Sequence, residues 1–378
     1  MSARVLTVLH VAANRWWTGS AEPIVHLATG LRDRGHRVLL AVIRGDRFET
    51  KARLAGLEPL PGFDLRPRGH PLRVARDIAR LRSLVRREGV DVIHAHHSHD
   101  HWLSVLARAR SAPGVPVPVV RTFHNLRSVR AGAAAALLHR RTAAAFAVSR
   151  AIEARCGDVG IPRARLFWTP GSVDVARFRP DVDPTPIRDE FKLGDAPVVV
   201  SVARFAAHRG HELLLAGFRA LLAEFPEARL LLVGKGERRA RLEQLVAELE
   251  LASRVVFTGY RDTDLPAVLT AADCFALMAA GSDESCRAAL EAMAAGRPVV
   301  ARRVGALPET VVHETTGLLV DGETPEAVTR ALVTVLRDRE RARAMGAAGR
   351  RRAETEFAPV RTVDTVEAVY RSLTARDA

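Results

Sequence analysis

The chain has 378 residues, of which 48% are hydrophobic and 26% are charged, and its formal net charge is +14. This length exceeds the size at which a single core usually keeps growing, so two domains are expected, and the composition excludes a disordered chain. The absence of a run of about 18 apolar residues excludes a conventional membrane-spanning segment. Three cysteines without Cys-x-x-Cys spacing favour a reduced, cytoplasmic setting.

The positive charge is concentrated in the N-terminal half. Residues 1–180 contain 30 Lys and Arg against 13 Asp and Glu, whereas residues 181–378 contain 27 against 30. This excess favours an anionic partner, such as a phosphorylated acceptor, a lipid headgroup or a membrane surface, although solvated faces of an arginine-rich protein would also explain it. Nucleic acid is disfavoured, because the chain has two tyrosines and no basic motif interleaved with aromatic residues.

Short apolar runs alternate with longer amphipathic segments along the chain, which predicts a parallel α/β architecture. We expect strands at 5–11 and 36–43 with a helix at 22–34 between them; the apolar run after Arg4 fits a buried strand better than a signal sequence. The loop after the first strand contains Trp17, Gly19 and Ser20, and it lies where open α/β sheets bind ligands. Trp17 either stacks on a sugar or lipid or covers the core.

The segment 73–88 predicts a basic amphipathic helix with apolar residues at helical spacing. It is either a solvated outer helix or a helix that contacts a membrane surface.

Histidines cluster after the next predicted strand, at 91–96. Alternation would put His94 and His96 on one face of that strand. A zinc site normally needs three well-placed ligands with carboxylate support, and no His-Glu-x-x-His spacing occurs, so no metal is expected. A further strand at 117–123 is followed directly by His124.

Prolines between 180 and 197 indicate a linker at 181–196, and a second α/β series begins at 197. Arg204 and Arg209 precede a helix predicted from about 211. Two cations ahead of a helix N-terminus are suited to a diphosphate, since fixed charges and free backbone N–H groups converge on the anion. Gly305 precedes a helix that begins near Pro308, and its backbone is a further candidate for holding phosphate.

The stretch 281–309 carries the strongest motif. Asp283 and Glu291 are separated by seven residues, and Ala292-Met293-Ala294-Ala295-Gly296 and Pro298-Val299-Val300 follow. If the segment is helical from Asp283 to Glu291, a rise of about 1.5 Å per residue separates the carboxylates by about 12 Å. Glu284 offers an alternative first carboxylate with a different spacing.

This stretch resembles the signature of retaining GT-B glycosyltransferases of the family 4 type (glycosyl transferases group 1). Other segments are similar to the same family: Gly19 to Glu22, Asp91 to His96, Thr122 to Asn125, Val173 with Asp174, and Val255 to Tyr260. Asp283 stands where the family usually has Glu, Ser20 where it has Gly, and Arg209 where it has Lys. The resemblance covers nearly the whole chain, most densely from 198 to 320.

The resemblance implies an α/β protein of the GT-B fold, with two Rossmann-like, doubly wound parallel sheets facing a central cleft. The first domain would span 1–180, the second 197–358, and a C-terminal helix from about 359 would cross back so that 359–378 pack on the first. The implied enzyme is a hexosyltransferase (EC 2.4) that needs no metal or other cofactor. It would move a sugar from a nucleotide-sugar, UDP-linked in the first place and GDP-linked in the second, to a glycan or glycolipid, as in cell-envelope or lipopolysaccharide synthesis.

The resemblance also assigns roles to residues. Catalytic roles fall to His124, Asp283, Arg204 and Arg209. Donor binding falls to these two arginines with Glu291, Gly234, Gly259, Tyr260, Ser285 and Gly305, and the acceptor side to Gly19, Ser20, Trp17 and His96. The expected location is the cytoplasm, with possible peripheral contact to the inner face of an anionic membrane. A UDP-sugar epimerase on the same fold, and a catalytically degenerate nucleotide-sugar-binding partner protein, remain as alternatives.

Overall fold

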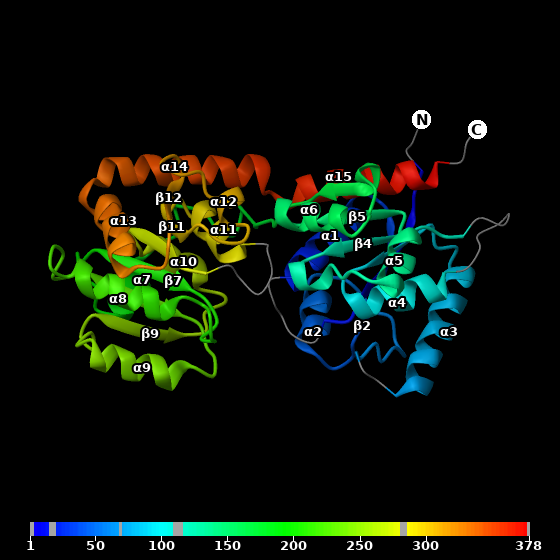
Figure 1. The fold of residues 1–378 in the computed structure, drawn as a ribbon, viewed down its shortest axis with the longest axis horizontal. Coiled ribbons are helices and arrows are strands. Elements are labelled where there is room, and N and C mark those ends of the chain that lie inside the picture. Colours follow the sequence, from blue (N-terminus) through cyan, green and yellow to red (C-terminus); the bar gives the residue numbers. More distant parts are fainter. Residues whose placement is uncertain (1–3, 15–19, 68–69, 109–115, 280–285, 376–378) are drawn as a thin grey trace. The chain divides into compact units, whose positions relative to one another are not determined.

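The structure, a computed structural model, describes residues 4–14, 20–67, 70–108, 116–279 and 286–375. The chain divides into two compact units (Figure 1). The first unit comprises residues up to 171 together with those from 359 onward, and the second comprises 172–279 and 286–358 of the described chain. No helix among the described residues is both long and apolar enough to cross a membrane.

The first unit is built on a six-stranded parallel sheet in the order β2-β1-β3-β4-β5-β6. Helices connect its strands, as a parallel sheet requires. In chain order its elements are β1 (Thr7–Ala12), α1 (Ala21–Asp33), β2 (Arg37–Val42), α2 (Arg47–Leu54), α3 (Pro71–Arg87), β3 (Val92–Ala95), α4 (Ser98–Ala107), β4 (Val119–Phe123), η1 (Leu126–Ser128), α5 (Ala133–Arg140), β5 (Ala144–Ala147), α6 (Arg150–Asp158), η2 (Arg163–Arg165), β6 (Leu166–Trp168) and α15 (Pro359–Thr374).

The second unit repeats this plan with six parallel strands in the order β12-β11-β10-β7-β8-β9. In chain order its elements are α7 (Thr185–Glu190), β7 (Val198–Val202), α8 (His211–Leu221), β8 (Arg229–Val233), α9 (Arg239–Glu248), β9 (Val255–Gly259), α10 (Leu265–Thr270), β10 (Cys274–Leu277), α11 (Arg287–Ala294), β11 (Val299–Arg302), α12 (Leu307–Thr310), β12 (Gly317–Val320), α13 (Pro325–Arg337) and α14 (Arg339–Glu356).

The C-terminal helix α15 belongs to the core of the first unit. Val363, Val366 and Tyr370 on α15 are buried together with Leu27 of α1 and Val8 of β1. The residues from 359 onward thus pack with residues from the beginning of the chain in one compact unit.

The segment 181–196, predicted as a linker, forms part of the second unit. It contains α7, and its residues Ile187 and Leu193 are buried in the core of that unit with Phe275. The prolines between 180 and 197 were a misleading signal, because one of them, Pro186, lies at the start of α7, where its missing N–H has no helical partner to lose.

The helix that carries Glu291 does not run back continuously to Asp283, which was the condition for the distance estimate. Helix α11 begins at Arg287, and Cys286 ahead of it has a φ of 50°, a left-handed backbone conformation. Residues 283–285, which include Asp283 and Ser285, lie outside the described residues. The 12 Å separation estimated from a helical rise therefore does not apply.

Helix α3 turns its apolar stripe inward. Leu81, Leu84 and Val85 are buried against the core of the first unit, with Val74 and Ile78 partly buried beside them. The arginines of α3 are left on its outer face, so any contact of this helix with a membrane would be electrostatic.

Candidate active site

The loop after β7 brings cationic groups to the carboxyl edge of the second sheet. Arg204 follows β7 directly, is exposed, and forms an ion pair of 2.9 Å with Glu237 from the loop after β8. Arg209 is partly buried and lies just before Gly210, the residue that precedes α8. The two arginines and the first N–H groups of α8 thus occupy one loop, as the sequence predicts.

This loop lies at the switch point of the second sheet. The chain proceeds from β7 to β8 on one side, while β10 pairs with β7 on the other. Gly210 has a φ of 73°, and a Cβ there would overlap the backbone of Met278, which follows β10. In open α/β sheets, ligands bind outside the strand ends at this topological position. The N-terminus of α8 is therefore held at the position where such a sheet binds anions.

Glycines allow the loops after β7 and β8 to touch through their backbones. A Cβ at Gly234 would overlap the carbonyl oxygen of Ala203, and one at Gly236 would overlap that of Phe205. The Phe205 N–H donates to the Lys235 carbonyl at 3.1 Å. The turn Gly234 to Gly236 therefore fixes the path of the loop that carries Arg204.

The loop after β9 joins the same edge. Gly259 has a φ of 77° and accepts a 2.8 Å hydrogen bond from the Gly234 N–H through its carbonyl. Tyr260 is exposed, and its ring lies 5.2 Å from the Lys235 ammonium. Gly305, with a φ of 54°, lies between β11 and α12. An exposed aromatic ring beside a cation is suited to stacking on a planar base.

Glu291 is buried within the second unit, although it is acidic. It lies on α11, is 3% exposed, and forms an ion pair of 3.3 Å with Arg287, one turn earlier on the same helix. A buried carboxylate is costly unless it is paired, so this position is specified by more than packing.

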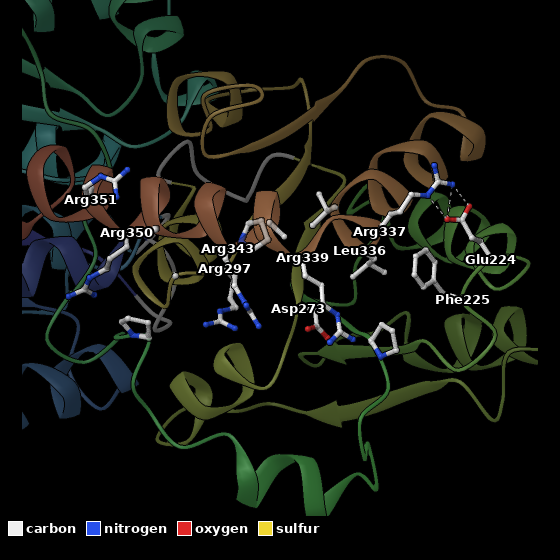
Figure 2. Close-up of a pocket in the computed structure, with 17 residues that line it drawn as sticks. Glu224, Phe225, Asp273, Arg297, Leu336, Arg337, Arg339, Arg343, Arg350 and Arg351 are labelled. Atoms are coloured by element: carbon white, nitrogen blue, oxygen red, sulfur yellow. Dashed lines mark hydrogen bonds and ion pairs between the residues drawn. The ribbon is translucent and has the colours of Figure 1, made fainter.

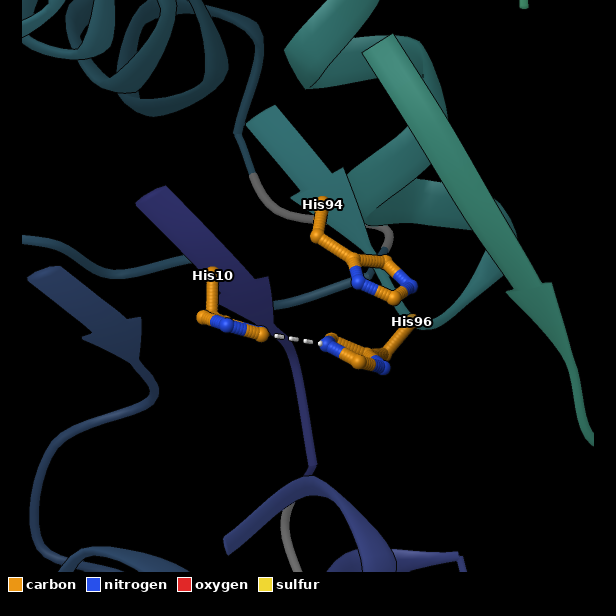
Figure 3. Close-up of side chains that lie close together, drawn as sticks. All are labelled: His10, His94 and His96. Atoms are coloured by element: carbon orange, nitrogen blue, oxygen red, sulfur yellow. Dashed lines mark hydrogen bonds between the residues drawn. The ribbon is translucent and has the colours of Figure 1, made fainter. Parts of the chain in front are cut away.

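In the first unit, four histidines meet where the strands of the sheet end. His94, His96 and His124 were singled out in the sequence, and His10 is the fourth. His10 lies on β1 and His94 on β3, while His96 and His124 follow β3 and β4; all four are buried. Figure 3 shows that the rings of His10, His94 and His96 are close together. Nδ1 of His10 lies 3.0 Å from Nε2 of His96, and the His96 and His124 ring centres are 6.0 Å apart.

Burial keeps these imidazoles neutral. Desolvation lowers the pKa of His10 to about 3 and holds the pKa of His94, His96 and His124 well below the ordinary value, with neighbouring positive charges adding to the effect for the last three. His124 is therefore a neutral hydrogen-bonding group at physiological pH rather than a cation.

The histidine cluster brings three nitrogens close together, but ring stacking and existing hydrogen bonds oppose their use as metal ligands. The nitrogens of His10, His94 and His96 lie within 4.8 Å of one another. However, the His94 and His96 rings are stacked with centres 4.2 Å apart, and both nitrogens of His94 already contact hydroxyls, those of Tyr370 at 2.5 Å and Thr122 at 2.7 Å. Lone pairs in the planes of stacked rings do not converge on one point, which a tetrahedral site requires.

A small cavity of about 30 Å³ adjoins His96, His124 and Thr122, and its wall includes Ile24 of α1. This volume is sufficient for a single water molecule. Nδ1 of His96 and Nε2 of His124 have no hydrogen-bond partner among the described residues, so both are available to a ligand or water in the cavity.

Several polar groups around this cluster were missed in the sequence. His10 stands within an apolar strand, and Tyr370 comes from α15, some 270 residues away from the His94 that it contacts. The buried Asp100 accepts hydrogen bonds from the N–H groups of Ala13 and His97, and burial raises its pKa to about 6. For His10, its position in an otherwise apolar strand could have indicated a functional residue. No comparable signal in the sequence pointed to Tyr370 or Asp100.

The structure describes some of the site residues predicted from the sequence but not all of them. Arg204, Arg209, Gly234, Gly259 and Tyr260 are carried by loops at one edge of the second sheet. Ser20 is buried and directly precedes α1. Gly19 and Trp17, like Asp283 and Ser285, lie outside the described residues.

Two doubly wound parallel sheets, the second with a cationic loop and a helix N-terminus at its switch point, are the architecture of the GT-B fold. Residues 17–177 match the family described as Glycosyltransferase Family 4, and residues 184–352 match Glycosyl transferases group 1. The chain therefore belongs to the glycosyltransferase family that these two descriptions name.

The chain is 35% identical over 285 residues to the GDP-mannose-dependent alpha-(1-6)-phosphatidylinositol monomannoside mannosyltransferase of Mycolicibacterium smegmatis, with 73% of this chain and 69% of the relative covered. It is 32% identical over 306 residues to the D-inositol 3-phosphate glycosyltransferase of Geodermatophilus obscurus, with 74% and 66% covered.

Solved structures share the fold. A glycosyltransferase from Rickettsia africae superposes with a TM-score of 0.86 at 16% identity, covering 99% of this chain and all of that structure. Anabaena HepE, crystallised with UDP and glucose, gives a TM-score of 0.82 at 20% identity, covering 97% of this chain and all of that structure.

Proposed function

We propose that this glycosyltransferase moves a hexose from a nucleoside-diphosphate sugar to an acceptor hydroxyl, with retention of the anomeric configuration. The observation that carries the proposal is the loop 204–210, which presents Arg204, Arg209 and the N-terminus of α8 at the switch point of the second sheet. Positive charge at this position would stabilise the departing diphosphate without a metal ion.

The remaining donor contacts follow from this placement. Glu291 would accept hydrogen bonds from the ribose hydroxyls, and Tyr260 would stack on the base. Gly234 and Gly259 would let the backbone approach the nucleotide closely. Asp283, Ser285 and Gly305 are proposed to hold the sugar and its phosphate. In the first unit, neutral His124 would hydrogen-bond a sugar hydroxyl, and the leaving phosphate would take the proton of the attacking hydroxyl.

For the donor, we place GDP-mannose first and UDP-sugars second. The Mycolicibacterium relative is named as GDP-mannose-dependent at 35% identity, whereas the Anabaena structure with UDP is 20% identical and supports the fold alone. This order reverses the one that the family resemblance implied.

For the acceptor, we propose a molecule that contains phosphorylated inositol. Both relatives carry such a group in the name of their acceptor, phosphatidylinositol monomannoside in one and D-inositol 3-phosphate in the other. The basic excess of residues 1–180 suits an anionic acceptor, and the arginine face of α3 would add electrostatic attraction if that acceptor is a lipid in an anionic membrane.

The test is a matrix of donors and acceptors with EDTA present throughout. GDP-mannose, UDP-glucose, UDP-N-acetylglucosamine and ADP-glucose are each incubated with inositol 3-phosphate, with phosphatidylinositol and with a mannosylated phosphatidylinositol. Products are identified by mass spectrometry and their anomeric configuration by NMR. We expect one donor and one acceptor class to give an axial, retained linkage.

Two outcomes would contradict the proposal. Interconversion of a UDP-sugar with its epimer in the absence of acceptor would indicate an epimerase. Saturable donor binding with neither transfer nor slow donor hydrolysis, across all acceptors, would indicate a binding protein without catalysis.

A further inference from the structure

The second unit contains a large cleft that is separate from the proposed donor site. Its volume is about 1190 Å³, and it lies between α14 and the turns that precede three strands of the sheet. Figure 2 shows the cleft with the side chains that line it. This volume exceeds that of a typical pocket for a drug-sized ligand, about 300–1000 Å³, so an extended ligand would fit.

The cleft lies at the amino edge of the sheet. Pro197 directly precedes β7, Asp273 directly precedes β10, and Pro298 directly precedes β11, and all three line it. The loops that carry Arg204, Gly234 and Tyr260 follow strands at the opposite edge. Strands of four or five residues span about 13–17 Å, so the two sites lie at opposite ends of the strands.

Arginine dominates the lining of this cleft. Six arginines contribute to it, together with two acidic residues among those described: Arg297, Arg337, Arg339, Arg343, Arg350, Arg351, Glu224 and Asp273. Both carboxylates already have partners. Glu224 binds Arg337 through both of its oxygens at 2.8 Å, and Asp273 accepts a 2.8 Å hydrogen bond from the Val198 N–H.

Two of the arginines are structural. Arg350 donates to the carbonyls of Phe178 and Ala294 at 2.6 and 2.8 Å, which ties α14 to its surroundings. The Arg297 guanidinium is largely buried and donates to the Ala272 and Ala295 carbonyls at 3.0 and 3.1 Å. Arg350 also forms an ion pair of 2.6 Å with Glu354, which compensates its charge. Arg297 donates only to carbonyl oxygens among the described residues, and these satisfy hydrogen bonds without neutralising its positive charge.

Arg339 and Arg343 differ from these two. Both are exposed, and neither forms a hydrogen bond or ion pair with any residue that the structure describes. They are four residues apart on α14, so they lie on one face of the helix, about 6 Å apart along its axis. Figure 2 shows their side chains reaching toward Arg297 and Asp273 in the cleft.

We propose that this cleft binds an anion that carries more than one phosphate group, with Arg339 and Arg343 as its principal contacts. Guanidinium groups bind phosphate oxygens in a bidentate manner, and two of them one turn apart fit two phosphates better than one. Arg297 would add positive potential from the wall. A free polyphosphorylated molecule and a set of lipid headgroups both present such phosphates, and the experiment below distinguishes these two sources.

The experiment compares matched variants of the full chain. The cleft variant is Arg339→Gln with Arg343→Gln, which keeps helix propensity and removes two charges. The matched control is Arg341→Gln, an exposed arginine of the same helix that does not line the cleft. A second control, Arg204→Gln with Arg209→Gln, disables the proposed donor edge. Circular dichroism checks that each variant is folded.

Binding of tripolyphosphate is measured by calorimetry, and binding to vesicles of phosphatidylglycerol or phosphatidylcholine by sedimentation. Because the proposed donor edge also suits a diphosphate, we expect the wild type and Arg341→Gln to show two classes of tripolyphosphate site. The cleft variant should lose one of them, with binding there at least ten-fold weaker, and the Arg204 and Arg209 variant should lose the other. If tripolyphosphate binds weakly to every form but only the cleft variant loses phosphatidylglycerol vesicles, the ligand is a lipid headgroup. Unchanged binding of both probes by the cleft variant, or loss only in the Arg204 and Arg209 variant, would overturn the proposal.

Discussion

Glu291 is the acidic side chain of the proposed donor site whose surroundings the structure describes. It is 3% exposed, and its 3.3 Å ion pair with Arg287 offsets part of the cost of burying its charge. Because α11 fixes both residues one turn apart, the carboxylate is held in place before any ligand binds. Such preorganisation reduces the entropy that donor binding would otherwise cost.

We expect Glu291→Gln to weaken donor use while the protein stays folded. A hydrogen bond to a charged group contributes about 1.5–3 kcal/mol, so kcat/KM for the donor should fall roughly 10- to 100-fold. The measurement is steady-state kinetics with the donor that the donor and acceptor matrix selects. Thermal unfolding is measured alongside. Glu326→Gln, an exposed acid in the first turn of α13, is the matched control and should leave both quantities unchanged. An unaltered kcat/KM in Glu291→Gln would remove Glu291 from the donor site.

At the scale of an element, the turn after β8 is the most constrained part of the proposed site. A Cβ on Gly236 would overlap backbone atoms of Phe205, and backbone cannot move aside as the end of a flexible side chain can. Phe205 lies in the loop after β7, which also carries Arg204, one residue earlier. A change at Gly236 should therefore be transmitted to Arg204, the cation proposed to face the diphosphate.

We predict that Gly236→Ala destabilises the second unit by about 1–3 kcal/mol and reduces donor affinity as well. The matched control is Gly157→Ala on α6, where a Cβ meets nothing within 4 Å, and alanine in a helix should be neutral or stabilising by up to about 1 kcal/mol. Urea unfolding and donor titration measure the two effects. Wild-type donor affinity in Gly236→Ala would show that the turn does not position Arg204.

Helix α15 connects the C-terminal segment to the histidine cluster. Tyr370 is fully buried, and its hydroxyl lies 2.5 Å from Nδ1 of His94, whose other nitrogen contacts Thr122. Tyr370→Phe would keep the packing of the ring and leave one buried nitrogen of His94 without its partner. We predict a loss of about 1–3 kcal/mol in the stability of the first unit.

Tyr370→Ala provides the comparison, since it also removes the ring and should cost about 3–5 kcal/mol. Chemical unfolding followed by a probe in the first unit distinguishes the two terms. If Tyr370→Phe is as stable as the wild type, the contact with His94 contributes nothing to holding α15 in place.

At the scale of the whole molecule, the order of strands and helices could be predicted well from the sequence. The strands predicted at 5–11, 36–43, 91–96 and 117–123 agree with β1, β2, β3 and β4 to within two residues, because a parallel strand buried on both faces reads as a continuous apolar segment. Local geometry was harder. The left-handed conformation of Cys286 and the packing of α7 depend on tertiary contacts that no local pattern records.

The candidate site divides in the same way. Arg204, Arg209 and Glu291 could be proposed from the sequence because each lies in a contiguous motif. The partners Tyr370 and Thr122 of His94 come from distant segments, and the arginine cleft gathers residues from before β7, β10 and β11 and from α14. Sequence spacing predicts what one segment presents, whereas such clusters depend on how segments assemble.

The buried histidines make the stability of the first unit depend on pH. The pKa of His10 and of His97 is lowered to about 3, and the pKa of His94, His96 and His124 lies well below the ordinary 6.5. Below pH 6.5 the unfolded chain therefore binds protons that the folded chain does not bind. Stability is complete above this pH and falls as the pH is lowered.

The buried Asp100 acts in the opposite direction. Its pKa is raised to about 6, so between pH 6 and its ordinary 3.8 the folded form binds the additional proton and gains stability as the pH falls. One carboxyl group cannot balance five histidines. The second unit has His211 in a comparable state, with its pKa lowered by burial to about 4.

We therefore predict that acidification from pH 8 to 5.5 destabilises the first unit more than the second. One pH unit below its ordinary pKa, each such histidine costs about 1.4 kcal/mol, although neighbouring groups do not add independently. Hydrogen exchange followed by mass spectrometry at several pH values, corrected for intrinsic exchange rates, reports each unit separately. His10→Gln, which stays neutral, should make the pH dependence of the first unit shallower by about one proton. Equal acid sensitivity of the two units would show that the histidine cluster is protonated in the folded protein and that His124 is not held neutral.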